Sequence, residues 1–252
     1  MSTPADHAAA ARIASEAGKL LVETRDNLIR LSVDTWTLRD EGDRRAHDCI
    51  VAALHEEFPD DSVLSEEGKD DPSRLSADRV WIVDPLDGTR EYSEGRDDWA
   101  VHVALTEGGI ATAAAVALPA LGRTFCTDPA APLPQRGDGP PRLVVSRSRP
   151  PAAAMIIAQA IEAQLVALGS AGAKAMSILL GQSDIYAHSG GQYEWDNCAP
   201  GAVAAAAGLH VSRADGSPMT YNHPDPWLPD LLICRPEYAE VSLTAIQRYL
   251  EE

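Results

Sequence analysis

The sequence has few cysteines, no long apolar run and a shortage of positive charge. Its four cysteines are scattered along the chain and form no C-x-x-C pair, so we expect neither a zinc site nor a disulfide framework. No stretch has the length and apolarity of a membrane span, and the first residues lack the apolar core of a secretory signal. These absences predict a reduced, cytoplasmic protein.

Acidic residues outnumber basic ones by 38 to 21, which gives a formal net charge of −17. Such a chain repels nucleic acid and anionic membranes, so neither is expected as a partner. An anionic substrate would need bound metal or a local basic patch. An acidic scaffold protein is an alternative that rests on charge alone, and a solvated acidic surface explains most of that charge without any function. The 252 residues suffice for one large domain or two associated subdomains.

Hydrophobic periodicity predicts an α/β architecture. In the N-terminal part we expect helices at residues 6–30 and 42–58, with Asp43 at the start of the second, and β-like runs at 36–38, 63–64, 80–84, 99–105, 110–118 and 123–127. A segment rich in proline and glycine, 128–141, predicts a boundary between an N-terminal subdomain (1–140) and a C-terminal one (141–252). After it, strands and helices alternate, which is typical of α/β proteins. The expected strands lie at 143–145, 165–168, 185–187 and 231–234, and the expected helices begin near 152, 171, 196 and 236.

The chain is organised around the stretch VWIVDPLDGT at residues 80–89. Its apolar start predicts a buried strand, whose ladder should end at Pro85 because proline has no amide hydrogen. Gly88 permits a tight turn, and Thr89 is a suitable N-cap for a following helical turn. Two aspartates would then crowd a strand end with backbone carbonyls and free amides, which suits divalent cations and phosphate. The alternative is a capped turn with solvated carboxylates.

Further acidic residues stand at positions that could complete a metal site. These are Asp43 at a helix start, Glu66-Glu67 after a short β-like run, and Asp196 in the sequence EWD. Taken singly, Asp43 and Asp196 could be N-caps, and Glu66-Glu67 could be a solvated loop. Their order along the chain is what favours a shared site.

The order D, E-E, D-P-L-D-G-T and W-D resembles the lithium-sensitive, magnesium-dependent phosphomonoesterases of the inositol monophosphatase and fructose-1,6-bisphosphatase superfamily. WIVDPLDGT at residues 81–89 is close to the first signature of that superfamily. Trp195-Asp196 with the small-residue helix up to Gly208 corresponds to the second, although Leu209 replaces its usual second glycine. The resemblance implies a five-layered αβαβα fold, a homodimer and inhibition by lithium.

The resemblance also implies a set of metal ligands. Glu66, Asp84 and the backbone carbonyl of Leu86 would hold one Mg²⁺, and Asp84, Asp87 and Asp196 a second. Glu66 would help to place a weaker third ion through water. All these ligands are oxygens, as magnesium requires. Carboxylates clustered without cations would have steeply raised pKa values, so bound metal is the natural way to stabilise them.

Asp43 and Thr89 resemble the pair that orients and deprotonates the attacking water in this superfamily. The threonine hydroxyl accepts a proton from the water while it donates its own to the carboxylate, so the two residues must be neighbours. The backbone amides of Gly88 and Thr89 would bind the phosphate. The residues expected to contact substrate are Glu66, Leu86, Asp87, Gly88, Thr89, Ser146, Arg147, Ser170, Lys174 and Asp196.

Two segments favour a nucleotide substrate. VSRSR at 145–149 and GSAGAK at 169–174 resemble segments of 3′-phosphoadenosine 5′-phosphate phosphatases of the CysQ type. A rough alignment also puts His188 where inositol monophosphatases carry an inositol-binding glutamate, which argues against inositol. Basic side chains here suit a second phosphate, although Arg147 and Arg149 could instead coat a surface turn. The basic residues are Arg142, Arg147, Arg149 and Lys174.

The resulting hypothesis is hydrolysis of the 3′-phosphate of 3′-phosphoadenosine 5′-phosphate, a small anionic ester, to AMP and phosphate. The same-class alternative is a broad phosphatase for inositol phosphates or fructose 1,6-bisphosphate. A catalytically silent metal- or nucleotide-binding module is the alternative from another class. Loss of a site residue would favour that module, but the sequence keeps an acceptable residue at every one of these positions.

Overall fold

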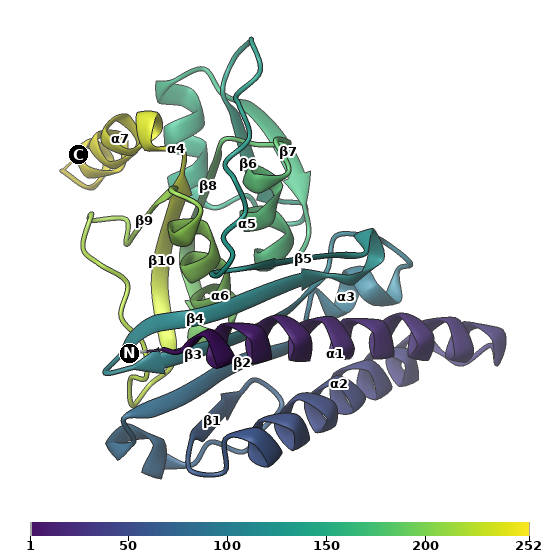
Figure 1. Cartoon of the computed structure of the whole chain (residues 1–252). Coiled ribbons are helices and arrows are strands. Elements are labelled where there is room, and N and C mark those ends of the chain that lie inside the picture. Colours follow the sequence, from purple (N-terminus) through teal and green to yellow (C-terminus); the bar gives the residue numbers. More distant parts are fainter. Residues whose placement is uncertain (1, 252) are drawn as a thin grey trace.

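The computed structural model describes residues 2–251, in which two five-stranded sheets alternate with layers of helices (Figure 1). The helices are α1 (Pro4–Arg30), α2 (Thr35–Glu57), α3 (Thr89–Ser93), α4 (Ala152–Ala160), α5 (Ala171–Leu179), α6 (Glu194–Ala206) and α7 (Ala239–Glu251). The strands are β1 (Ser62–Ser65), β2 (Arg79–Asp87), β3 (Ala100–Glu107), β4 (Ile110–Leu118), β5 (Arg123–Cys126), β6 (Arg142–Ser146), β7 (Gln164–Leu168), β8 (Ile185–Tyr193), β9 (His210–Ser212) and β10 (Trp227–Cys234). Short 3₁₀ turns lie at Pro72–Ser76, Pro119–Leu121 and Pro236–Tyr238.

The chain opens with two long helices that lie side by side (Figure 1). The expected β-like run at 36–38 was wrong, because those residues form the first turn of α2. Asp34 caps that turn by accepting a hydrogen bond from the backbone N–H of Thr37 at 2.9 Å, and α2 then packs along α1. Asp43 therefore lies about two turns inside α2 and does not open it.

The N-terminal sheet has the order β1-β2-β3-β4-β5, with β2 parallel to β1 and antiparallel to β3. In the β2–β3 ladder Asp84 is paired with His102 and Asp87 with Ala100, so the pairing skips the two residues between them. Pro85 thus interrupts the ladder as expected, but the strand continues to Asp87. The following turn uses Gly88 at φ +92° as the N-cap of α3.

Thr89 was expected to be the N-cap of α3, and this was wrong. It is the first helical residue, since the left-handed Gly88 already turns the chain before it. Its hydroxyl is consequently free for tertiary contacts.

The second sheet has the order β7-β6-β8-β10-β9. Its strands occur where the sequence predicted them, but β8 and β10 are longer than expected and β9 was not predicted. Helix α6 begins at Glu194, which places Asp196 in its first turn. Residues 127–141 connect the two sheets. The division into subdomains 1–140 and 141–252 stays a prediction.

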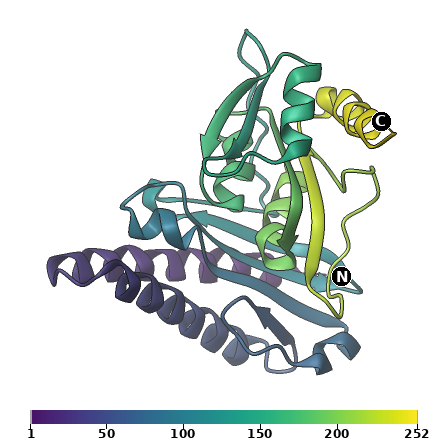
Figure 2. The ribbon, with the colours of Figure 1, turned by 180° about the vertical axis from the view of Figure 1, so that it is seen from behind.

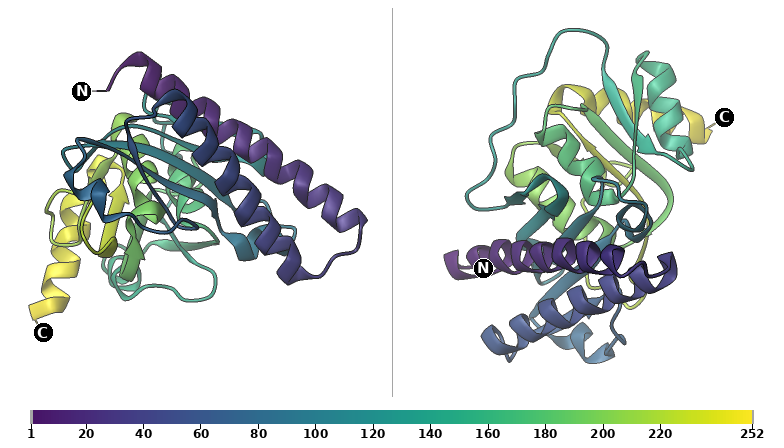
Figure 3. Two further views of the ribbon diagram at one scale, coloured as in Figure 1. Left: turned by 90° about the horizontal axis from the view of Figure 1, so that it is seen from below. Right: turned by 90° about the vertical axis from the view of Figure 1, so that its right-hand side faces the viewer.

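The elements stack in five layers, which confirms the expected αβαβα fold. Helices α1 and α2 cover the outer face of the first sheet, α5 and α6 lie between the sheets, and α4 and α7 cover the outer face of the second (Figures 2 and 3). The described residues form three apolar cores. One lies between the first sheet and helices α1 and α2, one lies between the second sheet and helices α4 and α7, and the largest surrounds α5 and α6 between the two sheets. No described helix is both long and apolar enough to cross a membrane. The central layer matters for function, because α5 and α6 begin beside the end of β2.

Candidate active site

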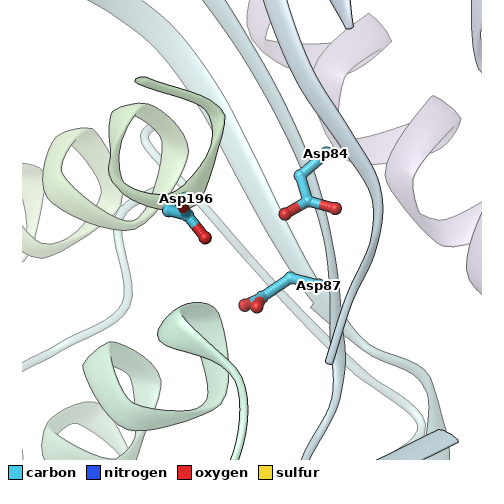
Figure 4. A group of neighbouring side chains, drawn as sticks. All are labelled: Asp84, Asp87 and Asp196. Carbon is cyan, nitrogen blue, oxygen red and sulfur yellow. The ribbon is translucent and has the colours of Figure 1, made fainter. Parts of the chain in front are cut away.

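Three aspartates from distant parts of the chain point toward one another beside the end of β2 (Figure 4). Asp84 and Asp87 come from β2, and Asp196 comes from the first turn of α6. Each offers a carboxylate oxygen, and the three oxygens lie within 4.8 Å of one another. The fold therefore brings together the acids of both signature-like stretches.

Asp84 is the most enclosed of these acids, with 1 % of its surface exposed. Its carboxylate accepts a hydrogen bond from the backbone N–H of Leu86 at 3.1 Å and shares a second one with the side chain of Glu66. Burial and the negative charge of Glu66 raise the pKa of Asp84 well above its ordinary value. Burial of the Glu66 carboxyl group and the charge of Asp196 raise the pKa of Glu66 to about 7. Glu66 therefore lies within electrostatic reach of Asp84 and Asp196, and its role as a metal ligand stays a prediction.

Asp87 lies in a cradle formed by the start of α5. Its carboxylate accepts hydrogen bonds from the Ser170 hydroxyl at 2.5 Å and from the backbone N–H groups of Ala171 and Gly172 at 3.0 and 2.6 Å. His102 on β3 places Nε2 3.2 Å from the same carboxylate. Burial alone would raise the pKa of Asp87, but the charge of His102 and these hydrogen bonds lower it to about 2.

The sequence did not point to His102 or Gly172 as parts of the site. His102 is fully buried, and its Nδ1 donates to the backbone carbonyl of Trp195 at 2.9 Å, so the ring joins β3 to the start of α6. A Cβ at Gly172 would lie 2.1 Å from His102 Nε2, so only glycine leaves room for the ring. In the sequence His102 is one more residue of an apolar strand, and no local signal distinguishes it.

Asp196 has two roles. Its carboxylate accepts a hydrogen bond from the backbone N–H of Tyr193 at 2.7 Å, which caps α6, so the capping interpretation was right in part. It also belongs to the acid cluster, where burial and the charge of Asp87 raise its pKa to about 6.

Thr89 and Asp43 are neighbours, as the water-activating pair requires. The Thr89 hydroxyl lies 3.2 Å from an Asp43 carboxylate oxygen and 3.1 Å from the backbone carbonyl of Leu86, and it can donate to either. Burial and the negative charge of Glu67 raise the pKa of Asp43 to about 7. A carboxyl group with this pKa can accept and release a proton near neutral pH.

A cavity of about 350 Å³ opens beside Asp87 and Asp196. Besides these two aspartates, three further expected substrate residues, Ser146, Ser170 and Lys174, line it together with His188. The Lys174 ammonium group is buried and donates to the backbone carbonyls of Gly169 and Ser170 at 3.1 and 2.6 Å. Burial lowers its pKa.

Two of the arginines that were expected to form a phosphate patch pair with acidic side chains. Arg147 pairs with Glu91 at 2.8 Å and Glu94 at 3.0 Å, and it does not line the cavity. Arg142 pairs with Asp184 at 3.2 Å.

The donor set fits a hard divalent cation. The converging side-chain atoms of Asp84, Asp87 and Asp196 are all carboxylate oxygens, the ligands that hard divalent cations prefer. Burial and, after it, the charges of neighbouring carboxylates raise the pKa values of Asp84, Glu66 and Asp196, and bound cations would offset both effects. With a cation bound, the arrangement can hold a phosphate group next to the Thr89–Asp43 pair.

Comparisons with known proteins agree with this geometry. A model of the inositol monophosphatase family matches residues 6–250. A 3′-phosphoadenosine 5′-phosphate phosphatase of Mycobacterium tuberculosis (strain CDC 1551 / Oshkosh) is 51% identical over 241 residues, which cover 92% of this chain and 89% of that protein. The 3′(2′),5′-bisphosphate nucleotidase CysQ of Escherichia coli (strain K12) is 33% identical over 193 residues, covering 71% and 77%.

Solved structures share the fold. The crystal structure of CysQ from Bacteroides thetaiotaomicron has a TM-score of 0.79 and 27% identity, and it covers 92% of this chain and 97% of its own. Inositol monophosphatase II from Staphylococcus aureus MSSA476 has a TM-score of 0.81 at 19% identity, covering 98% and 97%.

Proposed function

The chain belongs to the inositol monophosphatase family, and we propose that it is a magnesium-dependent phosphatase that converts 3′-phosphoadenosine 5′-phosphate to AMP and phosphate. One observation carries the proposal: the acid cluster, the Thr89–Asp43 pair and the cavity share one place in the fold. The similarity to the Mycobacterium tuberculosis protein named for this activity supports the choice of substrate.

Two to three Mg²⁺ ions would be held by Glu66, Asp84, Asp87, Asp196 and the carbonyl oxygen of Leu86. Bound there, magnesium supplies positive charge that neutralises phosphate oxygens and acidifies a water molecule. The protein prepares this site electrostatically. The cradle lowers the pKa of Asp87, whereas burial and the charges of neighbouring carboxylates raise the pKa values of Asp84 and Glu66, which a bound cation would lower again.

Thr89 and Asp43 prepare the attacking water. With its hydrogen directed to Asp43, the Thr89 oxygen presents its lone pairs to the water and accepts a hydrogen bond from it. The pKa of about 7 lets Asp43 take up the proton that passes through the hydroxyl. Because the water itself attacks phosphorus, no covalent intermediate on the protein is needed.

The far side of the cavity would hold the rest of the substrate. Ser146, Ser170 and Lys174 line it, and the hydroxyls and the ammonium group suit phosphate or ribose oxygens. His188 also lines the cavity. Unlike a glutamate, it has no carboxylate that could accept hydrogen bonds from several sugar hydroxyls. We propose Arg147 as a phosphate contact only after it leaves Glu91 and Glu94.

The test is phosphate release from equal concentrations of 3′-phosphoadenosine 5′-phosphate, inositol 1-phosphate and fructose 1,6-bisphosphate with magnesium. We expect the nucleotide to be preferred and Asp84→Asn to abolish turnover in a folded protein. Asp215→Asn, at a surface turn, is the matched control and should keep wild-type activity. Preference for inositol 1-phosphate would reject the substrate. Wild-type protein that binds magnesium but hydrolyses none of the esters would favour a silent binding module.

We also propose that the protein is a cytoplasmic homodimer. The four cysteines are all free thiols in the structure, which supports a reducing compartment. Sedimentation equilibrium tests the oligomeric state, and a mass of one chain, 26.9 kDa, would contradict the dimer.

A further inference from the structure

Two large aromatic side chains stand exposed in the wall of the substrate cavity. Tyr193 is 45 % exposed and Trp227 is 46 % exposed, and both line the cavity that also contains Asp87 and Asp196. Metal ions and phosphate need no aromatic neighbours. Flat apolar rings beside a phosphate site instead suit a ligand that carries a flat ring of its own.

Both rings are held in place by their surroundings. Tyr193 stacks on Trp195 with 4.7 Å between ring centroids and 9° between ring planes. Trp227 is paired with Tyr193 across strands β8 and β10, so the two side chains leave the sheet on the same face. A Cβ at Gly191 would lie 2.4 Å from the indole nitrogen of Trp227, so the glycine lets the indole lie against the backbone. Such prearranged rings lose little conformational entropy when a ligand binds.

A polar atom in the same wall lacks a partner among the described residues. Gln192 is 9 % exposed, and its side-chain nitrogen donates to the Tyr186 hydroxyl at 3.0 Å. Its side-chain oxygen is buried, accepts no hydrogen bond and belongs to a residue that lines the cavity. Buried acceptors are almost always paired in folded proteins, so this oxygen points to a ligand with an N–H or O–H group.

We propose that Trp227 and Tyr193 form the nucleobase subsite of the cavity, where the base stacks on them, and that the Gln192 oxygen accepts a hydrogen bond from the nucleoside. This rests on the proposed function. The phosphate ester lies at the acid cluster, and the base is the part of the substrate that sugar phosphates lack. Stacking therefore makes the subsite a determinant of specificity for nucleotides over sugar phosphates.

The test compares AMP, the product, with ribose 5-phosphate, which lacks the base, as inhibitors of phosphate release. Trp227→Ala should raise the inhibition constant of AMP and the KM of the nucleotide substrate about tenfold, with kcat unchanged. It should leave the inhibition constant of ribose 5-phosphate unchanged. Trp227→Phe keeps a flat ring and should restore most of the affinity. Trp36→Ala is the matched control, because Trp36 is a 72 % exposed tryptophan that does not line the cavity.

Gln192→Leu identifies the donor. Weaker inhibition by AMP alone places the donor on the base, and weaker inhibition by both compounds places it on the ribose. Unchanged inhibition by both would overturn the role of Gln192. The stacking proposal is overturned if Trp227→Ala and Tyr193→Ala leave AMP inhibition unchanged, or if they weaken AMP and ribose 5-phosphate equally.

Titration calorimetry of AMP and ribose 5-phosphate with wild-type protein separates this inference from the proposed function. Tighter binding of AMP that is lost in Trp227→Ala would support the subsite even if the protein hydrolysed no nucleotide. Hydrolysis of the nucleotide together with equal affinity for the two compounds would overturn the subsite and leave the proposed function standing.

Discussion

The metal-free protein should become less stable to unfolding as the pH rises from 5 to 8. Glu66, Asp196 and Asp43 have pKa values above their ordinary range, so the folded state holds their protons more tightly than the unfolded state does. The stability that this contributes is fully present below the unfolded pKa and is lost as the pH rises through the folded pKa. Acids with lowered pKa values, such as Asp6, have the opposite effect but complete it below pH 5.

Asp196 sets the scale of this effect. Its pKa rises from an ordinary 3.8 to about 6. At about 1.4 kcal/mol per pH unit, its contribution to the unfolding free energy is about 3 kcal/mol below pH 4, and about 1.4 kcal/mol of this is lost between pH 5 and pH 8. Glu66 and Asp43, with pKa values of about 7, act in the same direction at slightly higher pH. Because these acids interact, their separate effects are not additive.

The measurement is urea unfolding between pH 5 and 8, with a chelator and with magnesium. We expect the unfolding free energy to fall with pH in chelator and the stabilisation by magnesium to grow with pH. Asp196→Asn should make the curve in chelator flatter. Asp215→Asn should not, because hydrogen bonds from Ser217 lower the pKa of Asp215 and it ionises below this range. Constant or rising stability of the metal-free protein across the range would refute the reasoning.

Three further predictions concern the chemistry of the site. Asp43→Asn and Thr89→Val should each lower kcat by about 10²- to 10⁴-fold with little change in KM, whereas Thr89→Ser should keep substantial activity. Steady-state kinetics test this prediction, and an unchanged kcat in the first two variants would contradict it. Lithium should inhibit phosphate release in the millimolar range, as the family resemblance implies, and activity indifferent to lithium would contradict this prediction. Gly172→Ala should weaken magnesium affinity measured by calorimetry, because the new methyl group displaces His102. Gly137→Ala is the control and should not change the affinity, because Gly137 has open space around it. Equal affinities of the two variants would show that magnesium binding does not need the cradle around Asp87.

The sequence was sufficient for those features that local chemistry determines. An apolar run ending in D-P-L-D-G predicted β2 and its interruption at Pro85, and the small-residue helix predicted α6. It was misleading at residues 36–38, where tryptophan and threonine favour a strand locally. The Asp34 cap and the packing of α2 on α1 outweigh that preference.

The cradle around Asp87 could not have been predicted. It joins β2, β3 and α5, and its members have no fixed spacing in the sequence. His102 has the sequence context of any buried strand residue. The segment VSRSR at 145–149 shows the opposite case, in which a sequence signal did not match the contact in the fold. Its resemblance suggested that Arg147 contacts phosphate, yet Arg147 pairs with Glu91 and Glu94.

The two aspartates of β2 show how one site gives opposite properties to identical side chains. Both are buried, which by itself disfavours ionisation. Asp87 meets backbone N–H groups and His102, which lower its pKa, whereas burial and the charge of Glu66 raise the pKa of Asp84. The cluster therefore keeps one fixed negative charge that attracts a cation and other acids that give up protons as it binds. Because carboxylates bind cations in their ionised form, we predict that cation affinity falls as the pH drops below the range in which Asp84 and Glu66 ionise.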